Sequence, residues 1–226
     1  MNIASRLLCG SALLSLAVSS ASAGLPEGFY VSAELGRNWA DSARHSRVCN
    51  AVHTVTRSST HCYGSELFVY DDGWAAIAAV GFELTEHWKL EAELSYRIVD
   101  VGAAPASNAM WDLHDYVGMA NVVYERPLDD TWSVSLGAGI GVARETISWG
   151  GGEHSPTPAL AYQGLVGAGY RLSESTDVIA RFRVLKIVQP TNDLVGQVIG
   201  AGFYHEHDVY DDTNYETLSF GIRYRP

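Results

Sequence analysis

The sequence predicts an all-β fold: an eight-stranded antiparallel up-and-down β-barrel that spans a membrane, with short periplasmic turns and four long extracellular loops. Three observations favour this fold. One segment alternates apolar and charged residues with the period of a strand. The N-terminus resembles an export signal. The alternating pattern recurs along the chain, and the connections between its repeats alternate between short and long.

The segment Trp88 to Val99 has the clearest strand pattern. Successive side chains of a strand point to opposite faces of the sheet. One face here is apolar (Trp88, Leu90, Ala92, Leu94, Tyr96 and Ile98) and the other almost entirely charged (Lys89, Glu91, Glu93, Ser95 and Arg97). The apolar face would be the core of a water-soluble protein, but in a membrane barrel it would face lipid.

Residues 1–23 have the pattern of a cleaved secretory signal peptide. Arg6 precedes an apolar run from Leu7 to Val18, and Ala21-Ser22-Ala23 has the small–x–small form of a signal-peptidase site. The run is too short to span a bilayer as a mature helix. Cys9 lies early in this run behind a leucine, where lipidation would require a small residue, so we favour cleavage without lipidation.

Composition limits the class of protein. After the signal, no segment approaches the roughly 20 apolar residues of a transmembrane helix, so membrane insertion must use strands. Without Arg6, 14 of the 15 basic side chains remain against 26 acidic ones, a formal charge of −12. This balance argues against nucleic-acid binding, which requires a basic surface. Residues 24–226 suit one barrel domain.

The alternating pattern occurs in eight candidate strands, at residues 28–38, 74–84, 88–99, 115–125, 132–143, 159–172, 177–187 and 216–225. The connections at 85–87, 126–131 and 173–176 are short, whereas those at 39–73, 100–114, 144–158 and 188–215 are long. Short turns at one end and long loops at the other are typical of barrels of the outer-membrane type.

The predicted inward face carries nearly balanced charge, with six acids and seven bases. Eight strands leave a lumen filled by side chains, where charges must pair or suffer a large desolvation cost. We therefore predict an internal salt-bridge network in place of a conduction path. Its members are Glu34, Glu83, Lys89, Glu91, Glu93, Arg97, Glu125, Arg171, Arg181, Arg183 and Arg223, with Asp177 and Arg225 on the same face.

Aromatic residues on the apolar face distinguish a membrane barrel from the alternative of a soluble β-sandwich. They cluster near strand ends, where interfacial girdles belong. The predicted girdle residues are Trp88, Tyr96, Tyr116, Tyr124, Trp132, Tyr170 and Tyr224.

Two cysteines remain after the signal, Cys49 and Cys62, in the first long loop. An even pair in an exported chain predicts a disulfide. A metal-binding pair and two free thiols are the alternatives.

The fourth long loop concentrates groups that could bind a metal. His205, His207 and Asp208 would suit zinc or another divalent ion, but the two histidines share a face only if the segment is extended. We favour an acidic, solvated loop and expect neither a metal nor a cofactor. The glycines of 137–141 recur at period 2 with no helix after them, so they are not a phosphate loop. We expect them to make room for the large arginines and glutamates opposite.

No residue arrangement predicts catalysis. Serine hydrolysis needs a serine, a histidine base within hydrogen-bond reach and a group that orients the base. His45-Ser46 and His154-Ser155 are adjacent, so an extended chain would point them to opposite faces. His87 lies in a predicted turn and His114 at a strand edge. We expect no catalytic residue and no enzymatic activity.

Three segments carry a family resemblance: Gly118–Ala143 (GMANVVYERPLDDTWSVSLGAGIGVA), Ala161–Val184 (AYQGLVGAGYRLSESTDVIARFRV) and Ser219–Arg225 (SFGIRYR). With the signal and the segment GFYVSAELG, they resemble the opacity-protein-like, OmpA-type small outer-membrane barrels over most of the chain apart from the long loops. The resemblance implies a periplasmic N-terminus, surface-exposed loops and roles in envelope integrity, adhesion or host interaction. Members commonly end on an aromatic residue; Pro226 occupies that position here, and we expect Tyr224 to replace it in recognition by the assembly machinery.

The expected function is that of a non-enzymatic outer-membrane surface protein, structural or adhesive through its long loops. A small porin-like channel and a lipid A-modifying outer-membrane enzyme are the alternatives. The expected partners are outer-membrane lipid and lipopolysaccharide, the barrel-assembly machinery, and a host or other extracellular ligand at the loops. The expected location is the bacterial outer membrane.

Overall fold

The computed structural model describes residues 26–41, 43–53, 58–70, 72–102, 111–149, 152–154, 158–188, 192–198, 202–210 and 212–226. The predicted signal peptide at 1–23, with Cys9, lies outside the described residues. No helix in the described part of the chain is long and apolar enough to span a membrane.

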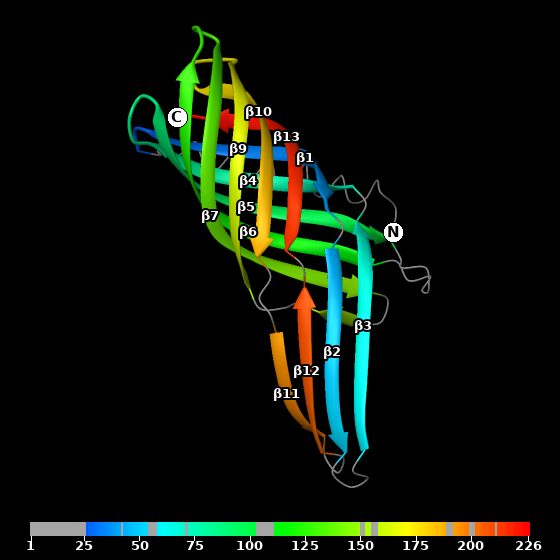
Figure 1. Cartoon of the computed structure of the whole chain (residues 1–226). Helices are drawn as coiled ribbons and strands as arrows, with labels where there is room; N and C mark the ends of the chain where they lie inside the picture. The colour runs from blue at the N-terminus through cyan, green and yellow to red at the C-terminus, as the bar shows by residue number, and fades with distance from the viewer. Residues whose placement is uncertain are drawn as a thin grey trace.

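Eight long strands close on themselves into an antiparallel barrel (Figure 1). They are β1 (Phe29–Ala40), β4 (Gly73–Glu83), β5 (Trp88–Gly102), β6 (Trp111–Pro127), β7 (Trp132–Trp149), β9 (Ala159–Arg171), β10 (Thr176–Val188) and β13 (Thr213–Tyr224). Each strand pairs with its neighbour in sequence among these eight, and β1 also pairs with β13, which closes the barrel. The predicted fold class is therefore confirmed.

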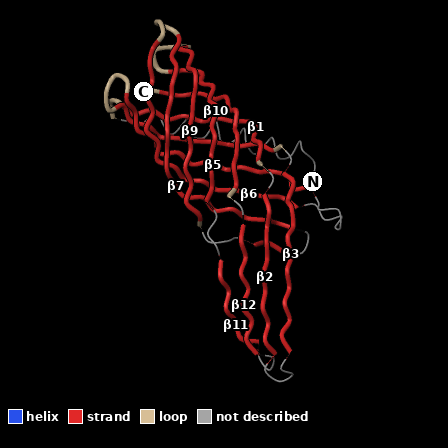
Figure 2. Tube along the Cα trace, viewed as in Figure 1, coloured by secondary structure: helices blue, strands red, loops and turns tan. Residues whose placement is uncertain are grey.

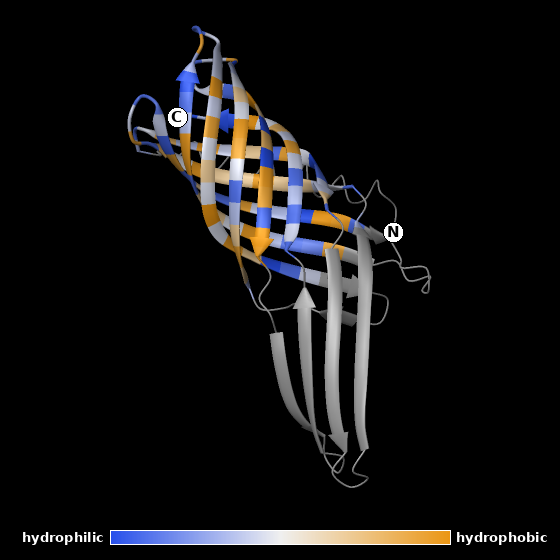
Figure 3. Cartoon of the chain, in the orientation of Figure 1, coloured by the Kyte–Doolittle hydropathy of each residue, from blue (hydrophilic) through white to orange (hydrophobic). Residues whose placement is uncertain are grey.

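From the short turns to mid-height, the barrel is apolar outside and polar inside, the reverse of a soluble core. On β5, Leu90 and Leu94 are 44% and 63% exposed, whereas Glu91 and Glu93 between them are 2% and 3% exposed. The same alternation continues around the wall and is visible along the strands in Figure 3. Period-2 patterning fixes two opposite faces in each strand, and closure of the sheet buries the charged one.

The three short connections are tight turns of strand hairpins. In the turn between β6 and β7, the Asp129 carboxylate accepts hydrogen bonds from the backbone N–H groups of Thr131 and Trp132, both at 2.7 Å. The turn between β4 and β5 is similar, with Thr85 Oγ1 accepting from Trp88 N at 3.1 Å. Before β1, Gly28 adopts φ 86°, a conformation that residues with a Cβ rarely adopt.

Two of the predicted long loops instead contain strands, so the prediction of loops at 39–73 and 188–215 is wrong in part. β2 (Ala43–His53) and β3 (Ser58–Tyr70) form one hairpin, and β11 (Asn192–Val198) and β12 (Gly202–Tyr210) form another. The two hairpins join through β12 and β2 into a sheet of order β11-β12-β2-β3 that projects beyond the barrel (Figures 1 and 2). We call this the extracellular sheet. It adjoins the barrel where Tyr70 of β3 pairs with Val101 of β5.

The strands β6 and β7 are also longer than the predicted 115–125 and 132–143. Their hairpin pairing continues to Asp112 opposite Ser148, and the short strand β8 (Gly152–His154) pairs with the end of β7. Uninterrupted ladder hydrogen bonds explain the extension, because each further pair satisfies backbone groups that would otherwise need other partners. The extension brings Asp115 and Glu145 into the barrel wall.

Candidate functional site

The interior at the short-turn end is filled by a first group of ion pairs. Lys89 Nζ lies 2.8 Å from Glu83 Oε1 and 3.0 Å from Glu125 Oε1. Arg223 binds Glu125 through Nη2 at 3.0 Å and donates from Nε to Asp177 at 2.9 Å. Arg225 binds Asp177 at 2.7 Å. Three acids and three bases therefore balance in this group.

A second group lies at mid-height and has better geometry. Arg181 binds Glu91 with two hydrogen bonds of 2.7 and 2.9 Å, and Arg183 binds Glu34 with two of 2.8 Å. Such bidentate pairs are the strongest form of charge-assisted hydrogen bond. All four side chains are at most 2% exposed. Their pairing therefore offsets the desolvation cost of burying each charge.

Neutral polar side chains that were not among the predicted residues complete the network. Tyr30 donates to Glu91 Oε1 at 2.8 Å, and Ser219 donates to Glu34 Oε2 at 2.7 Å. Glu93 accepts from Asn121 Nδ2 at 3.2 Å and from Gln163 Nε2 at 3.3 Å. Each shares the strand phase of an inward-facing charge, and that phase was the signal that could have identified them.

The structure brings together nine of the eleven predicted network residues in ion pairs. Arg97 is fully buried and donates to Ser95 Oγ. Arg171 lies exposed at the end of β9, apart from these pairs.

The interior nearer the long loops is filled differently. An apolar cluster includes Val99, Leu113, Val117, Leu185 and Ile187, each no more than 2% exposed. The cluster also contains Met119, Ala143, Ala159, Ala161 and Tyr215, so its members come from β5, β6, β7, β9, β10 and β13. The sequence pattern does not reveal this cluster, because its inward positions have the same alternation as the rest of each strand.

Inward glycines make room for bulky neighbours. A Cβ at Gly81 would lie 2.0 Å from the Tyr30 ring, and one at Gly139 would lie 1.9 Å from Asn121 Oδ1. The glycines of 137–141 were predicted to make room for arginines and glutamates, but the nearest side chains are different ones, Asn121 at Gly139 and Met119 at Gly141.

Six of the seven predicted girdle residues form ring pairs in two bands on the outer face. At the short-turn end, the ring of Trp88 contacts Tyr124 at 5.1 Å between centroids, and Trp132 contacts Tyr170 at 5.0 Å. Towards the long loops, Tyr96 contacts Tyr116 at 4.8 Å. Trp88 and Tyr96 are eight residues apart on β5, about 27 Å along the strand at roughly 3.4 Å per residue. A tilt of about 40° reduces this to about 20 Å of height, close to the apolar band of a membrane barrel.

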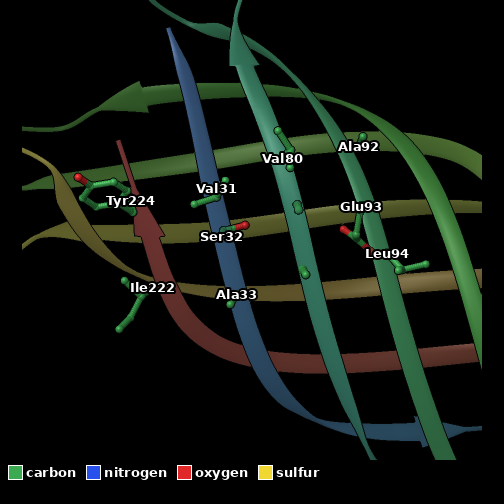
Figure 4. Close-up of a pocket in the computed structure, with 11 residues that line it drawn as sticks. Val31, Ser32, Ala33, Val80, Ala92, Glu93, Leu94, Ile222 and Tyr224 are labelled. Carbon is green, nitrogen blue, oxygen red and sulfur yellow. The ribbon is translucent and has the colours of Figure 1, made fainter. Parts of the chain in front are cut away.

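Two surface depressions differ in chemistry. A groove of about 380 Å³ on the outer face has Ala33, Ala78 and Ala92 among its lining, between larger side chains such as Leu94 and Ile222 (Figure 4). Its lining is apolar apart from the buried inner-face residues Ser32 and Glu93. The other, of about 270 Å³ and polar, lies at the short-turn end, with the Glu125, Asp177 and Arg223 side chains in its lining.

The predicted metal ligands and the cysteines lie on strands of the extracellular sheet. His205, His207 and Asp208 all lie on β12, which is an extended strand. The expectation of a loop there is wrong. Cys49 and Cys62 are directly opposite one another on β2 and β3. Among the side chains that the structure describes, no group of three or more histidine, cysteine or acidic side chains is placed to hold a metal.

The barrel histidines whose side chains the structure describes, His87 and His114, contact aromatic residues. His114 Nδ1 is 2.9 Å from the Tyr96 hydroxyl oxygen. His87 lies in the turn before β5, where its ring contacts Tyr124. His45 and Ser46 are consecutive residues of β2.

The closed barrel, its apolar exterior and its two aromatic bands agree with the comparison of the sequence with family models. The model of the outer membrane protein beta-barrel domain matches residues 9–225. The chain belongs to this family. Membership of this family places the chain in the bacterial outer membrane, with the short turns periplasmic and the long loops extracellular.

Solved structures show the same fold at low sequence identity. Neisserial surface protein A is 17% identical with a TM-score of 0.53, over 88% of this chain and 98% of that one. The outer membrane protein OprG from Pseudomonas aeruginosa is 13% identical with a TM-score of 0.50, over 90% of this chain and 99% of that one. No curated protein matches the sequence significantly.

Proposed function

We propose that this outer-membrane barrel is a non-enzymatic surface protein that supports the envelope and binds an extracellular partner through the extracellular sheet. One observation carries the proposal: the first and fourth long loops join into one sheet, β11-β12-β2-β3, which projects beyond the closed barrel. Long loops on a rigid barrel are a common location of binding function. The expected contacts with lipid, lipopolysaccharide and the assembly machinery would use the outer face of the barrel.

The extracellular sheet has the dimensions of a recognition surface. β2 has 11 residues and β3 has 13, which at about 3.3 Å per residue gives a length of about 36 to 43 Å. Tyr63, Tyr204 and Tyr210 lie on its strands, and tyrosine supplies contact area together with a hydrogen-bonding group.

Adhesion of bacteria that display the protein tests the proposal. In one variant, residues 44–67 are replaced by a short Gly-Ser turn, which removes the β2–β3 hairpin and leaves the barrel strands intact. The matched control shortens residues 150–157 at the end of β7. Adhesion to cultured epithelial cells or to surfaces coated with extracellular-matrix proteins should fall for the first variant alone. Equal adhesion of all three strains, with equal amounts of folded barrel in the membrane, would contradict the proposal.

A porin-like channel is the alternative within the same fold. The ion pairs and the apolar cluster together fill the interior at several levels, so we expect no conductance steps when the purified protein is added to a planar lipid bilayer. Reproducible steps that disappear when the protein is omitted would favour the channel.

A lipid A-modifying enzyme is the third possibility, and the described histidines give it no support. Mass spectra of lipid A from strains with and without the gene should be identical. A mass difference that returns to normal on complementation would overturn the non-enzymatic assignment.

A disulfide between Cys49 and Cys62 would stabilise the proposed binding surface. Directly opposite residues of an antiparallel pair have Cα atoms about 4.5–5.5 Å apart, within the range that a disulfide spans. Peptide mass spectrometry without reductant should find the two cysteine peptides linked. Two singly alkylated cysteine peptides would show free thiols.

A further inference from the structure

The two edge strands of the extracellular sheet differ in length and composition. β11 forms one edge with seven residues that include Asp193, and in the sequence Pro190 lies two positions before it. β3 forms the other edge with 13 residues, among which there is no lysine, no proline and one acid, Glu66. Proteins protect exposed sheet edges with short strands, charged residues and prolines. β11 has such protection, whereas β3 has none of it from Ser58 to Ser65.

The backbone of β3 is paired on one side over most of its length. On that side it pairs with β2 from Ser58 to Phe68. On the other side, its ladder within the described part of the chain is with β5, at Val69 and Tyr70 alone. Alternate residues of an antiparallel strand direct their N–H and C=O groups away from the partner. Every second residue of 58–68 can therefore bind a further strand, and Figure 1 shows β3 as the outermost strand on its side of the sheet.

The orientation of the protein in the membrane determines which copies can pair through β3. Two copies in one membrane point the same way, so their β3 strands run parallel, which is the slightly less stable arrangement. Two copies in facing membranes point in opposite directions, so their β3 strands run antiparallel. All strand pairs of the extracellular sheet that the structure describes are antiparallel as well.

We propose that β3 pairs edge to edge with β3 of a second copy on a neighbouring cell, which joins the two four-stranded extracellular sheets into one. A two-fold pair that uses all of residues 58–68 is centred on Tyr63, which lies opposite its own equivalent. Glu66 then lies opposite Thr60, so no like charges meet. Each pair is weak alone, but many pairs between two cells act together. The inference rests on the proposed function, since both use the extracellular sheet, and it names a second copy as a partner.

Charge-swap variants test the self-pairing in a clumping assay of bacteria that display the protein. One variant combines His61→Lys, Tyr63→Lys and Ser65→Lys, and the other replaces the same three residues with glutamate. Pairing centred on Tyr63 sets residue 61 opposite residue 65, so each variant opposes like charges to itself. Each variant alone should clump no more than cells without the protein. A mixture of the two, labelled with different dyes, should form clumps that contain both strains.

The matched control adds lysines to the other edge strand. Asn192→Lys combined with Gln197→Lys changes β11 and leaves β3 intact, so these cells should clump as the wild type does. Wild-type cells that clump no more than cells without the protein overturn the proposal. So does a mixture of the two charge-swap strains that stays dispersed although both barrels are folded in the membrane.

A peptide measurement on wild-type cells covers variants that fail to fold. A synthetic peptide with the sequence of residues 58–68, carrying Cys62→Ser, should inhibit clumping, whereas a scrambled peptide should not. Clumping that the first peptide leaves unchanged overturns the proposal. Adhesion to epithelial cells or matrix proteins is scored on dispersed single cells, so the two tests fail separately. Clumping without such adhesion supports self-pairing alone, and adhesion without clumping contradicts self-pairing but not the proposed function.

Discussion

The periplasmic and extracellular parts of the barrel interior are both filled, but by different kinds of side chain. From the periplasmic mouth to mid-height, arginine–carboxylate pairs fill the lumen, with Arg181 on Glu91 and Arg183 on Glu34 at the centre. Nearer the long loops, Leu113, Leu185 and Ile187 fill it with apolar packing. The comparison shows that a small barrel needs a full interior and not a particular kind of residue, provided that every buried charge has a partner.

Breaking an ion pair should have the largest effect. In Arg181→Ala, Glu91 loses both of its bidentate hydrogen bonds and is left as a buried charge, so we expect a loss of about 3–5 kcal/mol in the free energy of unfolding. Urea unfolding of the folded barrel in lipid vesicles measures it. Arg181→Met combined with Glu91→Leu should recover most of the loss, because it removes both charges. Arg37→Ala, which breaks an exposed pair with Asp72, is the control and should cost less than about 1 kcal/mol.

Truncation in the apolar part should cost nearly as much. Leu185 is fully buried in the cluster, so Leu185→Ala leaves a cavity and should reduce stability by about 2–5 kcal/mol. The next residue, Val184, is 47% exposed on the lipid-facing side, and Val184→Ala is the matched control. Equal losses for the two variants would mean that the cluster is not tightly packed.

Overpacking beside the ion pairs should have an intermediate effect. A Cβ at Gly81 would lie 2.0 Å from the Tyr30 ring, which would have to move from its hydrogen bond with Glu91. We expect Gly81→Ala to cost about 1–3 kcal/mol. Gly164→Ala is the control, because a Cβ there meets nothing within 4 Å. If the two variants unfold at the same urea concentration, Tyr30 is free to adjust.

The smallest effect should come from the periplasmic turn at Asp129, outside both parts of the interior. Hydrogen bonds from the backbone N–H groups of Trp132 and Thr131 lower the pKa of the Asp129 carboxyl below its usual value. A lowered pKa in the folded state means that the stabilisation is present above the unfolded pKa of about 3.9 and is lost as the pH falls through the folded value. Asp129→Ala should therefore be slightly less stable than the wild type at neutral pH, and the difference should disappear in acid. A difference that persists at low pH would exclude the carboxylate as its source.

Much of the barrel could be predicted because period-2 patterning is local. The segment Trp88 to Val99 assigns each side chain to a face without reference to any other strand, and the short turns at Thr85 and Asp129 limit the strands at the periplasmic end. The extracellular ends could not be placed in this way. Whether β6 and β7 stop at 115 and 143 or continue depends on the ladder between them, which extends to Asp112 opposite Ser148.

In the candidate sites, too, the local pattern predicted some features and not others. Phase alone assigned Glu34, Glu91, Arg181 and Arg183 to the interior, but the choice of partners depends on which strands face each other across the lumen. Asp115 and Glu145 were absent from the predicted network. Asp115 was the first residue of the predicted strand 115–125, and Glu145 lay beyond the end of the predicted strand 132–143. His205 and His207 were predicted in a loop, since nothing local shows that β12 pairs with β2.

The sequence by itself determined the number of barrel strands, the two faces of each strand and the positions of the periplasmic turns, because these follow from side-chain alternation and turn chemistry over a few residues. Only the tertiary structure decided how the arginines and carboxylates pair, where the apolar cluster begins, and that the first and fourth loops form one sheet. Those features arise between residues far apart in the chain, such as Glu34 and Arg183, where partner choice depends on closure of the barrel and not on local pattern.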